Sequence, residues 1–198
     1  MITIVSGLPR SGTSLMMQML AAGGIPVLSD GERVADTDNP RGYLEWERIK
    51  LLPQQPACIA EAEDKAVKVI SQLLLALPAG HQYRIIFMER PLTEVVASQA
   101  EMIRRRGTSG PKLADSVLLA ALQAHLNQVN SWLKSKGEAG FPVCRVQYHN
   151  VLANARLVCE TLQDFLGQSL NLEAMTGQID STLYRQRSAS YGRATLRE

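Results

Sequence analysis

The chain has 198 residues, of which 45% are hydrophobic and 20% charged, and its formal net charge at pH 7 is +2. This composition is that of an ordinary globular protein, and the length fits a single domain over residues 1–198. A net charge so close to zero argues against a nucleic-acid partner, and no apolar run is long enough for a transmembrane helix. The three cysteines, Cys58, Cys144 and Cys159, lack the paired spacing of metal ligands, so we expect reduced thiols and no metal site.

The N-terminal part of the chain alternates between apolar runs and glycines. Residues 2–6, ITIVS, predict a short strand, and the apolar spacing over residues 15–20 predicts a helix. Gly23 and Gly24 end that helix. Residues 25–44 are rich in Gly, Pro, Asp and Asn, and predict a long connection with at most a short strand.

The remaining elements continue this alternation. Apolar residues at helical spacing predict a helix over residues 66–77, closed by Pro78. Two further strands are expected at residues 84–88 and 143–147. Further helices are expected over residues 92–103 after Pro91, over 118–133, and over 151–165 with Asn150 as cap and Gly167 as stop.

Strands separated by helices imply parallel pairing, so the predicted fold class is α/β. We expect a three-layer P-loop-type fold with a mainly parallel central sheet. Ligands of such sheets bind at the carboxyl ends of the strands. The loop after Ser6 and the turn at Glu89 and Arg90 should therefore lie on the same edge.

Residues 7–14, GLPRSGTS, have the start of a phosphate-binding P-loop but not its lysine, because Thr13 follows the second glycine. Successive amides at a helix N-terminus favour an anion, and Arg10 can donate to two of its oxygens. The hydroxyls of Thr13 and Ser14 add two donors. The alternative is a strand-to-helix turn in which the hydroxyls only cap the helix. Since the loop begins so close to residue 1, we expect no signal peptide and a cytoplasmic protein.

The departures from the P-loop pattern bear on which anion binds. A nucleoside triphosphatase needs the missing lysine and a strand-end carboxylate that holds Mg²⁺. Here Arg90 follows the strand at 84–88, and an arginine repels a metal and attracts another anion. Both departures argue against ATP hydrolysis.

Residues 8–14, LPRSGTS, resemble the 5′-phosphosulfate loop of sulfotransferases that use 3′-phosphoadenosine-5′-phosphosulfate (PAPS). Arg90 and Ser98, eight residues apart, match the spacing of that family's 3′-phosphate site. Weaker similarity is present at residues 38–45, DNPRGYLE, and at residues 148–152, YHNVL. The resemblance implies PAPS as co-substrate, no metal, and nucleotide binding by Pro9, Arg10, Ser11, Gly12, Thr13, Ser14, Arg90 and Ser98.

The C-terminal residues match the family only loosely. PAPS enzymes often end in a basic segment that closes over the 3′-phosphate, and Arg185 and Arg187 are the candidates for it here. The alternative is a solvated tail. Arg90 likewise has an alternative interpretation, as a surface residue paired with Glu94 or Glu89.

The resemblance also indicates where a catalytic base should lie. No histidine falls where small-molecule sulfotransferases place their base, whereas several members use a glutamate after the first helix. Glu45 is the first candidate and is expected to begin a helix. Glu32, in a turn similar to that of protein-tyrosine sulfotransferases, is the second. Together with Arg10 these are the expected catalytic residues; the alternative for each glutamate is a solvated carboxylate.

The sequence thus predicts sulfuryl transfer from PAPS to a hydroxyl or amine acceptor. It specifies neither the acceptor, which could be a small molecule, carbohydrate, lipid or protein, nor the oligomeric state. Two rival interpretations stay open. One is a P-loop nucleotide kinase or triphosphatase with an aberrant loop, and the other is a non-catalytic nucleotide-binding module.

Overall fold

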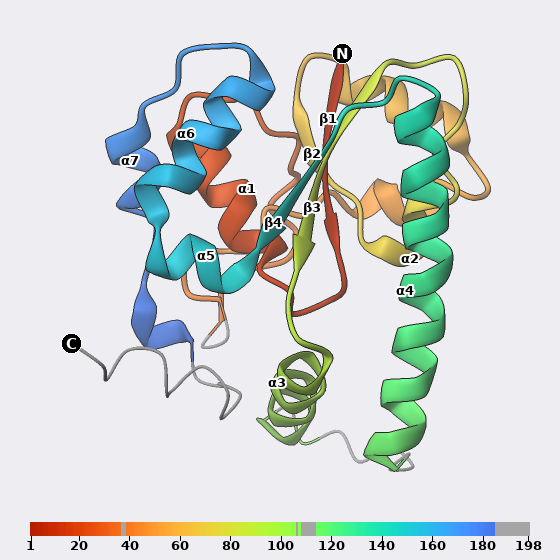
Figure 1. The fold of residues 1–198 in the computed structure, drawn as a ribbon, viewed down its shortest axis with the longest axis vertical. Coiled ribbons are helices and arrows are strands. Elements are labelled where there is room, and N and C mark those ends of the chain that lie inside the picture. Colours follow the sequence, from red (N-terminus) through yellow and green to blue (C-terminus); the bar gives the residue numbers. More distant parts are fainter. Residues whose placement is uncertain (37–38, 106, 108–113, 185–198) are drawn as a thin grey trace.

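The computed structural model describes residues 1–36, 39–105, 107 and 114–184. Its centre is a sheet in the order β2-β1-β3-β4, in which every neighbouring pair is parallel (Figure 1). The strands are β1 (Ile2–Gly7), β2 (Ala66–Lys68), β3 (Tyr83–Glu89) and β4 (Val143–Gln147). The expected parallel α/β sheet is therefore confirmed.

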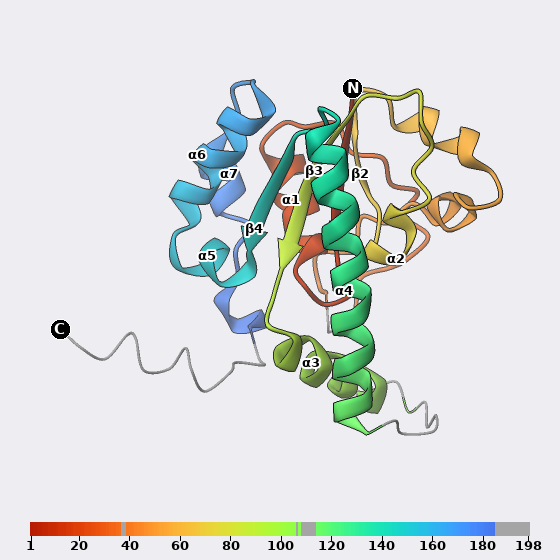
Figure 2. The same cartoon turned by 45° about the vertical axis from the view of Figure 1, so that its right-hand side comes forward.

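Side chains of the strands alternate between two apolar clusters, one on each face of the sheet. Val5 and Ile86 face helices α1 and α6, whereas Ile4 and Ile85 face helix α4. Full burial of each such side chain contributes roughly 1.5–3 kcal/mol to folding. The result is three layers, visible in Figures 1 and 2. On one face lie α1 (Thr13–Ala22), α6 (Ala155–Leu166) and α7 (Leu172–Thr176), and on the other α2 (Ser71–Leu74) and α4 (Asp115–Glu138).

The remaining elements lie at the ends of the strands and around the sheet. Helix α3 (Leu92–Arg105) follows β3, and the Val95 amide bonds to the Pro91 carbonyl as the expected first turn requires. Within the described residues, no helix combines the length and the hydrophobicity that crossing a bilayer requires. The other elements are α5 (Tyr148–Ala153), η1 (Glu47–Leu51), η2 (Pro56–Ala62) and η3 (Ser181–Leu183).

The prediction of a single helix over residues 66–77 is wrong. Ala66 to Lys68 form β2, which pairs with β1, and the Val69 amide continues the ladder to the Val5 carbonyl at 3.0 Å. Helix begins only at Ser71. A strand of three residues buried on both faces shows no alternation, so the apolar residues around it imitated helical spacing.

The helix predicted over residues 151–165 is divided into two helices in the structure. Helix α5 begins directly after β4, so Asn150 lies inside it and is not a cap. The chain breaks at Asn154, with φ −133° and ψ 46°, before α6 begins. Gly167 stops α6 in the left-handed conformation, with φ 65°, as the sequence predicts. Glu45 does not begin a helix either, since η1 starts at Glu47.

Candidate functional site

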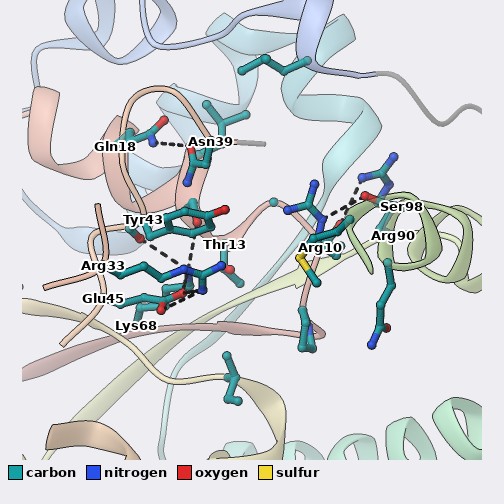
Figure 3. A pocket seen from close by; sticks show the side chains of 18 of the residues that line it. Arg10, Thr13, Gln18, Arg33, Asn39, Tyr43, Glu45, Lys68, Arg90 and Ser98 are labelled. Carbon is teal, nitrogen blue, oxygen red and sulfur yellow. Dashed lines mark hydrogen bonds and ion pairs between the residues drawn. The ribbon is translucent and has the colours of Figure 1, made fainter. Parts of the chain in front are cut away.

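A cavity of about 550 Å³ lies at the carboxyl edge of the sheet. Its wall combines the loop after β1, the end of β2, the connection that carries Tyr43 and Glu45, helix α3 and the chain before Tyr184 (Figure 3). This is the edge at which the sequence predicts the loop and Arg90 to meet. Pro9, Arg10, Gly12, Thr13, Ser14, Arg90 and Ser98 all line the cavity; Ser11 does not.

The loop between β1 and α1 has a constrained backbone. Gly7 and Gly12 have φ of 151° and 100°, and Arg10 has φ of 74°, which is uncommon for a residue other than glycine. A Cβ on Gly7 would lie 2.7 Å from the Met88 carbonyl oxygen, and one on Gly12 would lie 2.4 Å from the Tyr148 ring. Both positions therefore require glycine, which lets the loop pack tightly against its neighbours.

The N-terminus of α1 opens from this loop. Its first amides have no carbonyl partner within the helix, and the N-cap residue, Gly12, makes no side-chain cap. The Ser14 hydroxyl instead accepts a hydrogen bond from Lys68, at 2.9 Å. Among the described residues, the buried Ser11 hydroxyl finds no hydrogen-bond partner. The Ser14 hydroxyl thus bonds a lysine in this geometry and does not cap the helix.

Arg10, Arg90 and Ser98 come together on one side of the cavity (Figure 3). The Arg10 Nε donates to the Ser98 Oγ at 3.0 Å, and the Arg90 Nη1 donates to the Arg10 carbonyl at 3.1 Å. Arg90 also pairs with Glu94 at 2.9 Å, the partner anticipated by the surface interpretation. Its side chain is only 7% exposed, however, and lines the cavity. Arg90 is thus a buried cation rather than a surface one.

Lys68 is a cavity residue that the sequence reasoning missed. It ends β2, its side chain is 6% exposed, and its Nζ lies 2.8 Å from a carboxylate oxygen of Glu45. Burial lowers the pKa of Lys68, although the bond to Glu45 opposes that shift. The Lys68 ammonium lies beside Ser14 and so introduces a cation near the position where the loop lacks one. The sequence feature that could have indicated Lys68 is that it is the one charged residue in the apolar run 66–70, AVKVI.

Glu45 is held by two cations. Arg33 Nη1 donates to both of its oxygens, at 2.9 and 3.0 Å, and Lys68 Nζ donates to one of them at 2.8 Å. Burial raises the pKa of Glu45, but the hydrogen bonds and charges of Lys68 and Arg33 outweigh burial and leave it below its usual value. The carboxylate is therefore ionised and weakly basic. Arg33, itself 3.4 Å from the centroid of the Tyr43 ring, was also missed.

The other residues expected in the site divide into two groups. Glu32 is exposed, its amide bonds to Asp30 at 3.1 Å, and its side chain does not line the cavity. Arg185 and Arg187 lie outside the described residues. Within the part of the chain that the structure describes, no three His, Cys, Asp or Glu side chains are grouped so as to hold a metal ion.

No protein-family model matches the sequence, and no curated protein matches it. Solved structures do match the fold. The sulfotransferase domain of the Synechococcus PCC 7002 olefin synthase aligns over 93% of this chain and 78% of its own, with 16% identity and a TM-score of 0.52. Sulfotransferase STF1 from Mycobacterium tuberculosis H37Rv aligns over 92% and 73%, with 14% identity and a TM-score of 0.58.

A third match is the sulfotransferase domain of the curacin biosynthetic pathway. It aligns over 90% of this chain and 77% of its own, with 14% identity and a TM-score of 0.53. Each of the three alignments covers at least nine tenths of this chain. This chain therefore has the fold of bacterial sulfotransferase domains.

Proposed function

We propose that this chain is a PAPS-dependent sulfotransferase that transfers a sulfuryl group to a hydroxyl or amine acceptor. The observation that carries the proposal is a single cavity with two sets of anion-binding groups. One is the loop after β1 with Arg10, and the other is Arg90 with Ser98. PAPS has two separate anionic groups, so a protein that binds it needs two such sets.

The residues fall into roles by position. The first amides of α1 and Arg10 bind the 5′ phosphosulfate, and Arg90 and Ser98 bind the 3′-phosphate. Lys68 bonds Ser14 in the first turn of α1, and with the sulfuryl group bound there this pair would stabilise the charge that develops in transfer.

The proposed step balances without a further reactant. The acceptor atom forms a bond to sulfur while the bond from sulfur to the bridging phosphate oxygen breaks. The electron pair leaves on that oxygen with 3′,5′-ADP, and the acceptor proton goes to a carboxylate of the cavity, for which we assign Glu45. Its bonds to Lys68 and Arg33 orient this carboxylate but weaken it as a base.

The acceptor that suits this wall has an apolar body. Trp46 follows Glu45 directly, Ile70 lies just beyond Lys68, and both line the cavity together with Ile49, Leu73 and Met102. Lys50 and Arg105, which also line the cavity, are paired with Glu47 and Glu101. We therefore assign phenols and apolar alcohols, rather than polyanionic carbohydrate, as the acceptor class.

The first expected result concerns nucleotide choice. 3′,5′-ADP should stabilise the protein far more than 5′-AMP, because 5′-AMP offers nothing to Arg90 and Ser98. At a hundred times its dissociation constant a ligand adds about 2.7 kcal/mol to the free energy of unfolding. Thermal unfolding with each nucleotide measures the difference, and equal stabilisation by both removes the 3′-phosphate site.

A magnesium series tests the kinase alternative, which one observation favours: Lys68 supplies a cation beside the loop that has lost its lysine. A kinase or triphosphatase needs Mg²⁺ on its nucleotide. We expect the stabilisation by 3′,5′-ADP to be the same with and without Mg²⁺. A strict magnesium requirement, or a larger shift with ATP, supports the kinase instead.

Arg10→Ala should weaken binding of PAPS by about 1.5–3 kcal/mol, the range for a hydrogen bond to a charged group. The fold should persist, because Arg10 is only partly buried and contributes little to the core. Isothermal titration with wild type and variant measures the loss. Arg10→Lys is the matched control: it keeps the charge and should retain most of the affinity. Unchanged binding in Arg10→Ala means that the loop does not hold the nucleotide.

A further inference from the structure

The guanidinium of Arg90 is enclosed by groups from three separate segments. Its Cζ lies 4.8 Å from the ring centroid of Tyr148 and 5.2 Å from that of Tyr184. The two rings meet edge to face, with centroids 5.4 Å apart. Glu94, in the first turn of the helix that follows Arg90, pairs with its Nε at 2.9 Å. Two aromatic faces and one carboxylate thus restrict how Arg90 can turn.

Glu94 is itself held from the C-terminal side. Its side chain is 2% exposed, and the Tyr184 hydroxyl lies 2.8 and 2.9 Å from its two oxygens. Burial, and then the hydrogen bond to Glu94, raise the pKa of Tyr184 to about 12, so the hydroxyl stays protonated and donates at neutral pH. A buried carboxylate needs such donors, because an incompletely paired buried charge is costly.

We propose that Glu94 and Tyr184 are positioning residues that fix Arg90 for a 3′-phosphate, which makes nucleotide selectivity depend on a tyrosine 94 residues beyond the arginine that it positions. This inference rests on the proposed function, since it concerns the same nucleotide. It adds that the chain just before residue 185 helps to hold the phosphate site, because Tyr184 bonds Glu94 and its ring lies beside Arg90. Tyr184 acts through Glu94 and Arg90 rather than by contact with the reacting atoms.

Glu94 permits a sharp test, because its two effects on phosphate binding are opposite. Its negative charge repels a phosphate, whereas its hydrogen bond holds Arg90 in position to bind one. If Glu94 only reduced the positive charge at Arg90, Glu94→Gln would strengthen binding of 3′,5′-ADP. If Glu94 positions Arg90, the same variant weakens it. Tyr184→Phe removes one hydroxyl, keeps the ring beside Arg90, and is the variant with the smaller risk to folding.

The experiment is isothermal titration of the full chain with 3′,5′-ADP and 5′-AMP, and the readout is the ratio of their affinities. We expect Tyr184→Phe and Glu94→Gln each to lower affinity for 3′,5′-ADP by about tenfold, the scale of one hydrogen bond. Affinity for 5′-AMP should not change. Tyr83→Phe is the matched control, because it removes a tyrosine hydroxyl bond to the Pro78 carbonyl (3.0 Å) at the start of β3. Its affinity ratio should equal that of wild type.

The outcomes separate the inference from the proposed function. If wild type binds both nucleotides equally, the 3′-phosphate site fails, and the positioning role fails with it. If wild type is selective but both variants keep the wild-type ratio, or Glu94→Gln binds 3′,5′-ADP more tightly, only the positioning role is overturned. Equal losses for both nucleotides in Tyr184→Phe mean general damage to the fold and also reject it.

Discussion

Glu45→Gln is expected to reduce sulfuryl transfer by roughly 10²–10⁴-fold, the usual contribution of a positioned general base. The carboxylate lines the cavity and is bonded to Lys68, which in turn bonds Ser14 of the loop. Gln has the same shape but accepts no proton. The assay is consumption of PAPS with phenols and apolar alcohols, measured beside binding of 3′,5′-ADP, which should persist in the variant.

Stability must be followed in the same variant, because Glu45 also compensates a buried cation. Removal of one partner of a buried ion pair typically lowers the free energy of unfolding by about 3–5 kcal/mol. Partial unfolding of the variant would then reduce activity without any loss of catalysis in the folded protein. The double variant Glu45→Gln with Lys68→Met removes both charges and should regain part of the lost stability without regaining activity. Denaturant titration of the three proteins separates these effects.

Glu32→Gln is the matched control for the base. This carboxylate is exposed and does not line the cavity, so its loss should leave turnover near that of wild type. Full activity in Glu45→Gln rejects the assignment. The reverse pattern, with activity lost only in Glu32→Gln, transfers the role to Glu32.

Gly12→Ala should have the largest effect on stability, a loss of roughly 2–6 kcal/mol. Backbone strain at φ 100° costs about 1–3 kcal/mol, and the new Cβ, 2.4 Å from the Tyr148 ring, adds an overpacking cost of similar size. Displacement of Tyr148 also disturbs Arg90, which lies over its ring, so nucleotide affinity should fall as well. Urea unfolding and nucleotide titration measure the two losses.

Gly24 offers a control for the strain alone. Its φ of 99° is nearly that of Gly12, but a Cβ there would meet nothing within 4 Å. Gly24→Ala should therefore show only the smaller backbone cost, and nucleotide affinity should not change. If both alanine variants lose the same stability, contact between the loop and Tyr148 is not what requires glycine at residue 12.

The parallel sheet was predictable because β1, β3 and β4 are separate strand-forming runs with helical segments between them. The approach of the loop with Arg10 to the turn with Arg90 was predictable for the same reason, since parallel strands bring their carboxyl ends to one edge. Gly167 as a helix stop followed from local chemistry alone. These features depend on short-range pattern, which a single sequence contains.

Lys68 and Arg33 depend on long-range contacts and were missed. β2 is a strand because it pairs with β1 more than sixty residues earlier, and its three residues are too few to show a period. The ammonium of Lys68 is compensated by Glu45, which reaches it from a connection without regular structure. Nothing within a few residues of either side chain indicates the other, so their ion pair could not be inferred from spacing.

The order of the strands in the sheet has a consequence for which ligands fit the cavity. β1 carries the loop with Arg10, and its direct neighbour β3 leads into Arg90, with Gly7 paired to Met88 in register. Neighbouring strands lie about 4.8 Å apart, and backbone hydrogen bonds fix that spacing. The spacing between the two chain segments that lead to the arginines is thus set by backbone hydrogen bonds rather than by flexible side chains. A substitution that shifts the β1–β3 register would displace these two segments relative to each other. It would change which ligands fit, even if every side chain of the cavity were kept.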